Sequence, residues 1–438
     1  MNNLTTISPI DGRYSDKISD CNQYFSEFGL MKYRCKIEIE YFIFLELYKI
    51  FKIPIDLFKL RDIYNNFTIE DAKRIKTIES EIKHDVKAIE LFLNEKFDEY
   101  KFQGKQYIHF GLTSQDINTS SNVLQLKDFK NNIYNKTITN LLNLLKTKIT
   151  IWQIPILSHT HGQPATPTKM SKEIAVFYER IKVQINNWNN LRYSTKFGGA
   201  TGGMNAHYIT YPTIDWIDFA NKFCLNLGLQ REQMTTQISH YDNLSEHFSY
   251  YKRINVILID LCRDIWSYIS MNYFRLKVVE KEVGSSAMPH KVNPIDFENA
   301  EGNLMFANVI FDFMSNKLPI SRLQRDLTDS TILRNMGVAC SHTVLAIRNI
   351  CNGLNKLQLD IKTINTDLEN NWVVISEAIQ NILRINGNTD AYNLVKNFVR
   401  NNVVDKNSMN SFINDLKIDK KLKYQLLNIT PFNYGINK

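Results

Sequence analysis

The chain has 438 residues and a formal net charge of +8, with 44% hydrophobic and 22% charged residues. This length supports a large buried core, and these fractions are ordinary for a soluble globular protein. Glycine (16) and proline (10) together make up about 6% of the residues, roughly half of their usual share, which excludes collagen, disordered Pro/Gly linkers and turn-dense all-β folds and favours long helices.

The same sequence argues against several cellular settings and partners. It contains no run of 18 apolar residues, so we expect no transmembrane helix. The N-terminal residues lack the basic and apolar regions of a secretory signal, and the six cysteines form no C-x-x-C pair, so we expect a cytoplasmic protein with reduced thiols and no zinc site. No block of five like charges occurs, which weighs against a nucleic-acid partner and fits an anionic small-molecule substrate.

Long intervals between helix breakers, and the apolar spacing within them, predict the secondary structure. Apolar residues at i, i+3, i+4 and i+7 are typical of amphipathic helices. Two such stripes comprise Ile138, Leu141, Leu142, Leu145, Ile149 and Trp152, and Ile254, Ile257, Leu258, Leu261, Ile265 and Tyr268. We predict an all-α fold with an N-terminal helical domain (1–110), a central long-helix bundle that also makes subunit contacts (111–364) and a C-terminal helical domain (365–438).

Two polar motifs near the N-terminus are weak signals when taken alone. In residues 8–14, Pro9 and Gly12 predict a turn that presents Arg13, whose guanidinium suits phosphate or carboxylate, and the stacking face of Tyr14. Taken alone, this segment is better explained as an ordinary N-terminal turn. In residues 83–85, a carboxylate follows a histidine, although a surface histidine is the simpler interpretation.

Two further motifs fit helix ends. In residues 109–116, Thr113 or Ser114 can cap a helix with Asp116 in its first turn, and a helix N-terminus is a natural anion site. In residues 325–335, two arginines and a serine can form a phosphate clamp, while a salt-bridged helix face is the alternative.

The strongest signals are two breaker-rich loops. In Thr-His-Gly-Gln-Pro-Ala-Thr-Pro (160–167), His161 lies between breakers just before a predicted helix, where packing explains it poorly and a general acid or base explains it better. In Gly-Ser-Ser-Ala-Met-Pro-His-Lys-Val-Asn-Pro (284–294), small residues leave backbone N–H groups free to bind a carboxylate, and hydroxyl, imidazole and ammonium groups follow within seven residues.

Together with Ser-Pro-Ile-Asp-Gly-Arg-Tyr, Lys-His-Asp-Val, Thr-Ser-Gln-Asp and Arg-Asp-Leu-Thr-Asp-Ser-Thr-Ile-Leu-Arg-Asn, in this order, the two loops resemble the adenylosuccinate lyase family of the fumarase/aspartase superfamily, bacterial type. His290 supports this resemblance, because fumarases carry glycine there. The resemblance implies three helical domains, a homotetramer with shared active sites and a pooled central bundle, and no metal or organic cofactor. It also implies a carbon–nitrogen lyase that releases fumarate by β-elimination in purine biosynthesis, from adenylosuccinate (giving AMP) and from the succinylated aminoimidazole carboxamide ribotide SAICAR (giving AICAR).

The resemblance also assigns roles to residues of this sequence. Ser285 matches the base, His161 the acid that protonates the leaving nitrogen, and His84 a second histidine near the substrate. Because serine is a poor base in water, we expect the loop that carries Ser285 to act as a mobile lid. The residues that match substrate-binding positions are Arg13, Tyr14, Lys83, Asp85, Thr113, Ser114, Gln237, Ser286, Lys291, Asn293, Asn299, Arg325, Ser330 and Arg334. The alternatives are another lyase of the superfamily, argininosuccinate lyase first, and a non-catalytic relative that keeps the fold.

Overall fold

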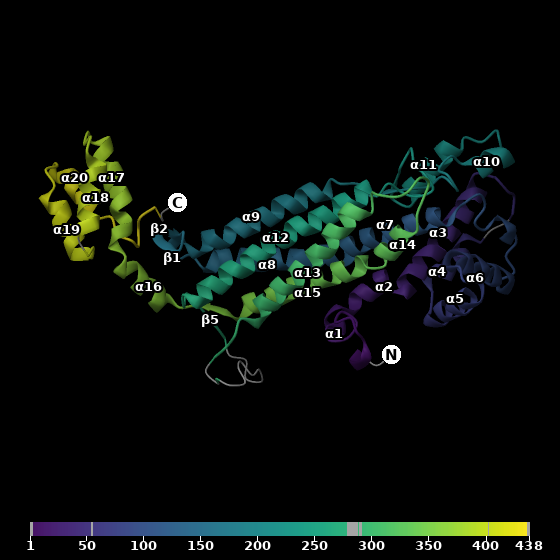
Figure 1. The fold of residues 1–438 in the computed structure, drawn as a ribbon, viewed down its shortest axis with the longest axis horizontal. Coiled ribbons are helices and arrows are strands. Elements are labelled where there is room, and N and C mark those ends of the chain that lie inside the picture. The colour runs from purple at the N-terminus through teal and green to yellow at the C-terminus, as the bar shows by residue number, and fades with distance from the viewer. Residues whose placement is uncertain (1–2, 54–55, 278–287, 289–290, 402, 436–438) are drawn as a thin grey trace. The chain divides into compact units, whose positions relative to one another are not determined.

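A computed structural model describes residues 3–53, 56–277, 288, 291–401 and 403–435. Helices dominate this part of the chain, and its strands are short and paired only two by two (Figure 1). The all-α prediction is therefore confirmed. No helix within the described ranges is long and apolar enough to cross a membrane.

The described chain divides into two compact units. The first unit comprises residues 1–139, 183–259 and 300–348, and the second comprises residues 140–182, 260–299 and 349–438. All five boundaries between the units fall within long helices, which contribute segments to each unit: α8 (Asn135–Ile151), α9 (Met170–Asn189), α12 (Asp242–Ser270), α13 (Ile295–Lys317) and α15 (Met336–Lys356). The three domains predicted from the sequence divide the chain differently from these two units, and that three-domain division stays a prediction.

The first unit carries most of the short and medium helices. Its α-helices are α1 (Ser15–Ile18), α2 (Asn22–Phe25), α3 (Glu27–Leu47), α4 (Leu57–Asn65), α5 (Ile69–Ile82), α6 (Asp85–Glu99), α7 (Ser114–Phe129), α10 (Asn205–Thr210), α11 (Trp216–Asn226) and α14 (Thr328–Leu333). Shorter elements are the 3-10 helices Asn3–Thr5, Ser19–Cys21 and Lys105–Tyr107, a π-helical turn at Lys130–Tyr134, and the parallel strands β3 (Ser194–Thr195) and β4 (Gln230–Arg231). Figure 1 shows α3 beside α7, and the two helices pack on each other.

The second unit contains the C-terminal helices and two antiparallel strand pairs. Its elements are β1 (Pro155–Thr160), β2 (Gln163–Lys169), β5 (Phe274–Leu276), β6 (Leu357–Leu359), α16 (Ile361–Asn370), the 3-10 helix Trp372–Ile375, α17 (Ser376–Ile385), α18 (Ala391–Asn401), α19 (Lys406–Asp415) and α20 (Lys420–Leu427). In Figure 1 the yellow-green helices α17 to α20 lie together.

The two predicted apolar stripes lie on helices, as expected, except that Trp152 follows the last residue of α8. Ile138, Leu141 and Leu145 of α8 are buried, and so are Ile254, Leu258, Leu261 and Ile265 of α12. Burial of such stripes supplies most of the stability of helices in proteins, since isolated helices are marginal in water.

The segment around His161 differs from the expectation of a loop leading directly into a helix. Thr160 pairs with Gln163, so His161 and Gly162 form the two-residue turn of the β1–β2 hairpin, and α9 begins only at Met170. Both turn residues have positive φ, 53° and 73°. Two consecutive positive φ values match the right-handed twist of the flanking strands, which is why the chain forms a hairpin here.

Candidate active site

The candidate residues of the first unit are positioned mainly by helix ends. Lys83 ends α5 in a left-handed conformation, His84 caps α6 by accepting a hydrogen bond at Nδ1 from the Lys87 amide (3.1 Å), and Asp85 is the first residue of that helix. Thr113 precedes α7, and its amide donates to Asp116 Oδ2 at 2.8 Å. The predicted helix start with Asp116 in the first turn is therefore confirmed.

The other candidates of this unit lie in loops or on α14. Arg13 is exposed in the N-terminal turn, and the Tyr14 amide donates to the Pro9 carbonyl at 2.9 Å, as a turn requires. Gln237 is half-buried in the segment before α12. Arg325 precedes α14 and lies 3.9 Å from the Asp329 carboxylate. Ser330 lies within α14, and Arg334 directly follows that helix.

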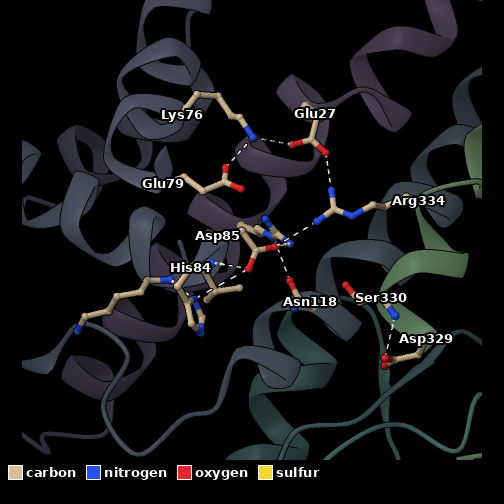
Figure 2. A network of polar contacts seen from close by, with 12 residues as sticks. Glu27, Lys76, Glu79, His84, Asp85, Asn118, Asp329, Ser330 and Arg334 are labelled. Atoms are coloured by element: carbon tan, nitrogen blue, oxygen red, sulfur yellow. Dashed lines mark hydrogen bonds and ion pairs between the residues drawn. The ribbon is translucent and has the colours of Figure 1, made fainter. Parts of the chain in front are cut away.

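An ion-pair network joins three of these elements (Figure 2). Arg34 Nη2 of α3 lies 2.6 Å from Asp85 Oδ2, and Arg34 Nε donates to Asn118 Oδ1 of α7 at 2.9 Å. Arg334 Nη2 lies 3.5 Å from the same Asp85 oxygen. Burial opposes the ionisation of Asp85, but these guanidinium groups and the Val86 amide outweigh it and hold the pKa of Asp85 below its usual range.

A polar pocket lies beside this network. Its lining residues are Phe25, Ser26, Glu27, Leu30, Arg34, Gln115, Asn118, Asn122, Gln125, Asp329, Ser330, Leu333, Arg334, Met336 and Gly337. Two sequence-predicted residues, Ser330 and Arg334, thus line one pocket together. Hydroxyl, carboxamide and guanidinium groups meet there, and they are the groups that proteins use to bind phosphate and sugar oxygens.

A buried ion pair supports the start of α7. Lys196 and Asp116 have side chains that are 0% exposed, and Lys196 Nζ lies 2.8 Å from Asp116 Oδ1. The amides of Gly198 and Gly199 also donate to this carboxylate, at 2.8 Å and 3.1–3.2 Å. Burial lowers the pKa of Lys196, although Asp116 opposes the shift. Asp116 therefore ties the 196–199 segment to the turn that carries Thr113.

Two histidines of the first unit flank the same turn. His109 Nδ1 lies 2.6 Å from Glu38 Oε1. Burial opposes protonation of His109, but the Glu38 carboxylate outweighs burial, so the pKa of His109 is raised above its ordinary value. His207 is fully buried, with Nε2 2.9 Å from the Tyr41 hydroxyl, and burial lowers its pKa to about 4. His207 is therefore neutral near pH 7.

In the second unit, His161 is exposed at the tip of its hairpin. Lys291 is exposed and Asn293 half-buried ahead of α13, and Asn299 within α13 accepts a hydrogen bond from Asn349 at 2.6 Å. Ser285 and Ser286 lie outside the described residues, as does most of the expected lid. Within the described ranges, no group of three His, Cys, Asp or Glu side chains is placed to bind a metal ion.

Reasoning from the sequence missed several residues of the first unit that contact the candidates or support the helices that carry them. Arg34, Glu27, Asn118 and Lys196 are the clearest examples. A signal existed for Arg34, which stands among apolar residues of a predicted helix, since a charge on a buried helix face needs a partner. The partner itself lies 51 residues away, at Asp85, and spacing could not reveal it.

Comparisons with known proteins bear on this site. Residues 56–310 match the family described as lyase, and residues 321–435 match the family described as adenylosuccinate lyase C-terminal. The adenylosuccinate lyase of Dictyostelium discoideum is 49% identical over 99% of this chain and 97% of its own length. That of Escherichia coli strain K12 is 41% identical, with the same coverage of each chain.

The chain belongs to the adenylosuccinate lyase family. This membership confirms the recognition from motifs and the prediction of a lyase, and it favours adenylosuccinate lyase over the argininosuccinate alternative. A 3-carboxy-cis,cis-muconate lactonizing enzyme from Pseudomonas putida has the same fold, with a TM-score of 0.77 at 19% identity over 97% of this chain and 96% of its own. A fumarate lyase from Mesorhizobium sp. BNC1 is similar, with a TM-score of 0.74 at 16% identity over 96% of this chain and 94% of its own.

Proposed function

We propose that this chain cleaves adenylosuccinate to AMP and fumarate, and SAICAR to AICAR and fumarate, as an enzyme of purine nucleotide biosynthesis in the cytoplasm. The observation that carries the proposal is membership of the adenylosuccinate lyase family over nearly the full chain. The pocket lined by Ser330 and Arg334 supports it, because a nucleotide substrate requires a phosphate site.

The chemical step is a β-elimination that needs one base and one acid. We assign the base to Ser285, which takes the proton next to a succinyl carboxylate. The C–H electron pair then forms the new C=C bond of fumarate as the C–N bond breaks. His161 gives its proton to the leaving nitrogen, so that the nucleotide amine leaves neutral. His84, at the start of α6, is assigned as a second histidine near the substrate.

Stabilisation of the developing charge falls to donors at the succinyl end. Proton removal next to a carboxylate builds a dianion, which needs aligned N–H, O–H and ammonium groups in a site without bulk water. We assign this role to Thr113, Ser114, Lys291 and Asn293, with Ser286, Gln237 and Asn299 as further contacts. For Thr113 and Ser114, the start of α7 supplies a favourable helix dipole, and the Asp116–Lys196 pair fixes the turn.

The nucleotide end is assigned to a second group of residues. Arg334 and Arg325 supply charge for the phosphate, and Ser330 supplies a hydroxyl. Arg13 and Tyr14 serve the phosphate and the base from the N-terminal turn, and Lys83 and Asp85 contact the substrate from the α5–α6 junction. The position of Ser330 and Arg334 on one pocket supports this assignment.

We propose that four copies assemble and share active sites. Helix α13 supports this: Met305, Phe306, Val309 and Phe313 are 49–67% exposed in the single chain, although they follow the spacing of one helix face. An apolar face of this kind on a long helix calls for a partner helix. Light scattering after gel filtration should give about four times the chain mass of 51.2 kDa, and a monomer would contradict the proposal.

A parallel assay of three substrates tests the proposed specificity. Fumarate release is measured with adenylosuccinate, SAICAR and argininosuccinate at equal concentrations. We expect release from the first two only, because argininosuccinate has no phosphate group for the pocket of Arg334 and Ser330 to bind. Faster release from argininosuccinate would overturn the assignment.

A further inference from the structure

The guanidinium of Arg334 is held by two carboxylates at once. Arg334 Nη1 lies 2.6 Å from Glu27 Oε1, and Nη2 lies 3.5 Å from Asp85 Oδ2 (Figure 2). Glu27 is the first residue of α3, and it also lines the pocket that contains Ser330. We propose that Glu27 acts as a displaceable counter-ion, which holds Arg334 and competes with a phosphate monoester for it.

Competition follows from the geometry of a guanidinium. Phosphate is bound best when two parallel N–H groups of arginine point at two of its oxygens. Both terminal nitrogens of Arg334 face carboxylates. An incoming phosphate must therefore displace at least one of them, or it approaches a guanidinium whose charge is largely neutralised.

Glu27 is the carboxylate that can leave. Its side chain is 52% exposed, against 28% for Asp85. Asp85 is also fixed by Arg34 at 2.6 Å and by the Val86 amide at 2.9 Å, so releasing it would break two further contacts. Among the described residues, Glu27 has no comparable anchor beyond Arg334 and the more distant Lys76.

Lys76 provides a place for the displaced carboxylate. Its Nζ lies 3.8 Å from Glu27 Oε2 and 2.7 Å from Glu79 Oε2 (Figure 2). A small rotation of Glu27 away from Arg334 would shorten the contact to Lys76, so the negative charge of Glu27 keeps a cation beside it. Phosphate binding would then exchange one ion pair for another, which keeps binding reversible and favours release of a nucleotide product.

This proposal rests on the proposed function, because it takes Arg334 as a phosphate ligand. The test uses Glu27→Gln, which keeps the size and removes the charge. Binding of AMP, inorganic phosphate and adenosine is measured by calorimetry on the full-length protein. We expect the dissociation constants of AMP and phosphate to fall about two- to fivefold, since a solvent-exposed ion pair of this kind is weak. Adenosine has no phosphate, and its binding should not change.

The matched control is Glu79→Gln, which removes the same charge from the same network without touching Arg334. We expect this variant to shift AMP binding less than Glu27→Gln does. An equal shift in both variants would mean that only net charge matters, and unchanged or weaker AMP binding in Glu27→Gln would mean that Glu27 orients Arg334 instead; either result overturns the proposal.

A double-mutant cycle gives a readout that a structural role for Glu27 would not move. In an Arg334→Lys background, which keeps the charge and loses the paired N–H groups, Glu27→Gln should lose most of its effect on AMP binding.

The two proposals can fail separately. Failure of the proposed lyase function would appear as absent turnover by the unaltered protein, whereas the Glu27 proposal is judged on binding alone.

Discussion

The buried Lys196–Asp116 pair offers a sharp test of how the first unit holds the turn before α7. Replacing Lys196 with methionine keeps much of its volume but leaves the Asp116 carboxylate buried without its cation. The cation lies 2.8 Å from Oδ1, and both side chains are fully buried. Breaking a buried ion pair from one side costs about 3–5 kcal/mol, because the remaining charge is uncompensated.

Two observations place the expected loss within this range. The Gly198 and Gly199 amides still donate to Asp116 in the variant, and they soften the penalty. The Gly199 carbonyl, however, loses the Lys196 ammonium that donates to it at 2.6 Å. We therefore expect the free energy of unfolding to fall by about 3–4 kcal/mol.

The measurement is urea unfolding followed by circular dichroism at one fixed protein concentration, since assembly contributes to apparent stability. The control is Lys73→Met, which removes a lysine 2.7 Å from Glu70 where both side chains are more than two-thirds exposed. Its free energy of unfolding should change by less than about 1 kcal/mol. Equal losses in the two variants would refute the role given to the buried pair.

Three further predictions concern catalysis, acid stability and a close glycine contact. His161→Ala should lose most of its turnover while its circular dichroism spectrum is unchanged, because His161 is exposed on a hairpin tip, and near-normal turnover would refute the acid assignment. Burial lowers the pKa of His207 to about 4, below the ordinary 6.5, so the unfolded chain binds the proton first and stability is lost as pH falls from about 6.5 to about 4. Urea unfolding at pH 7.5 and pH 5 should show a loss of about 2 kcal/mol from such a histidine, and equal stability at both pH values would refute its buried neutral state. Gly111→Ala should destabilise the protein by about 1–3 kcal/mol in thermal or urea unfolding, because Gly111 has a φ of 67° and an added Cβ would lie 2.5 Å from the His207 ring; a change below about 0.5 kcal/mol would contradict this contact.

The sequence predicted the helices well, because each leaves a local pattern. The apolar stripes of α8 and α12 follow helical spacing, and Thr113 with Asp116 marks the start of α7. The β1–β2 hairpin was not predicted, because its strands carry Pro164 and Pro167 and show no clear alternation of apolar and polar residues. Only the positive φ of His161 beside Gly162 reveals the turn type.

The contacts around the candidate site could be predicted only in part. Ser330 and Arg334 are one helical turn apart, so spacing alone placed them together. Arg34 meets Asp85, and Lys196 meets Asp116, across 51 and 80 residues of sequence. Such pairs depend on how whole helices pack, which a single sequence does not state. The roles of Ser285, Lys291 and the other assigned residues stay predictions until variants are measured.

The central claim is that this chain cleaves adenylosuccinate, and product analysis tests it most directly. Purified protein and its Ser285→Ala variant, prepared identically, are incubated with adenylosuccinate, and AMP and fumarate are quantified by mass spectrometry. We expect the unaltered protein to form both products in equal amounts over many turnovers, and the variant to form almost none. Absence of both products with the folded, unaltered protein, or equal formation by the variant, would contradict the account.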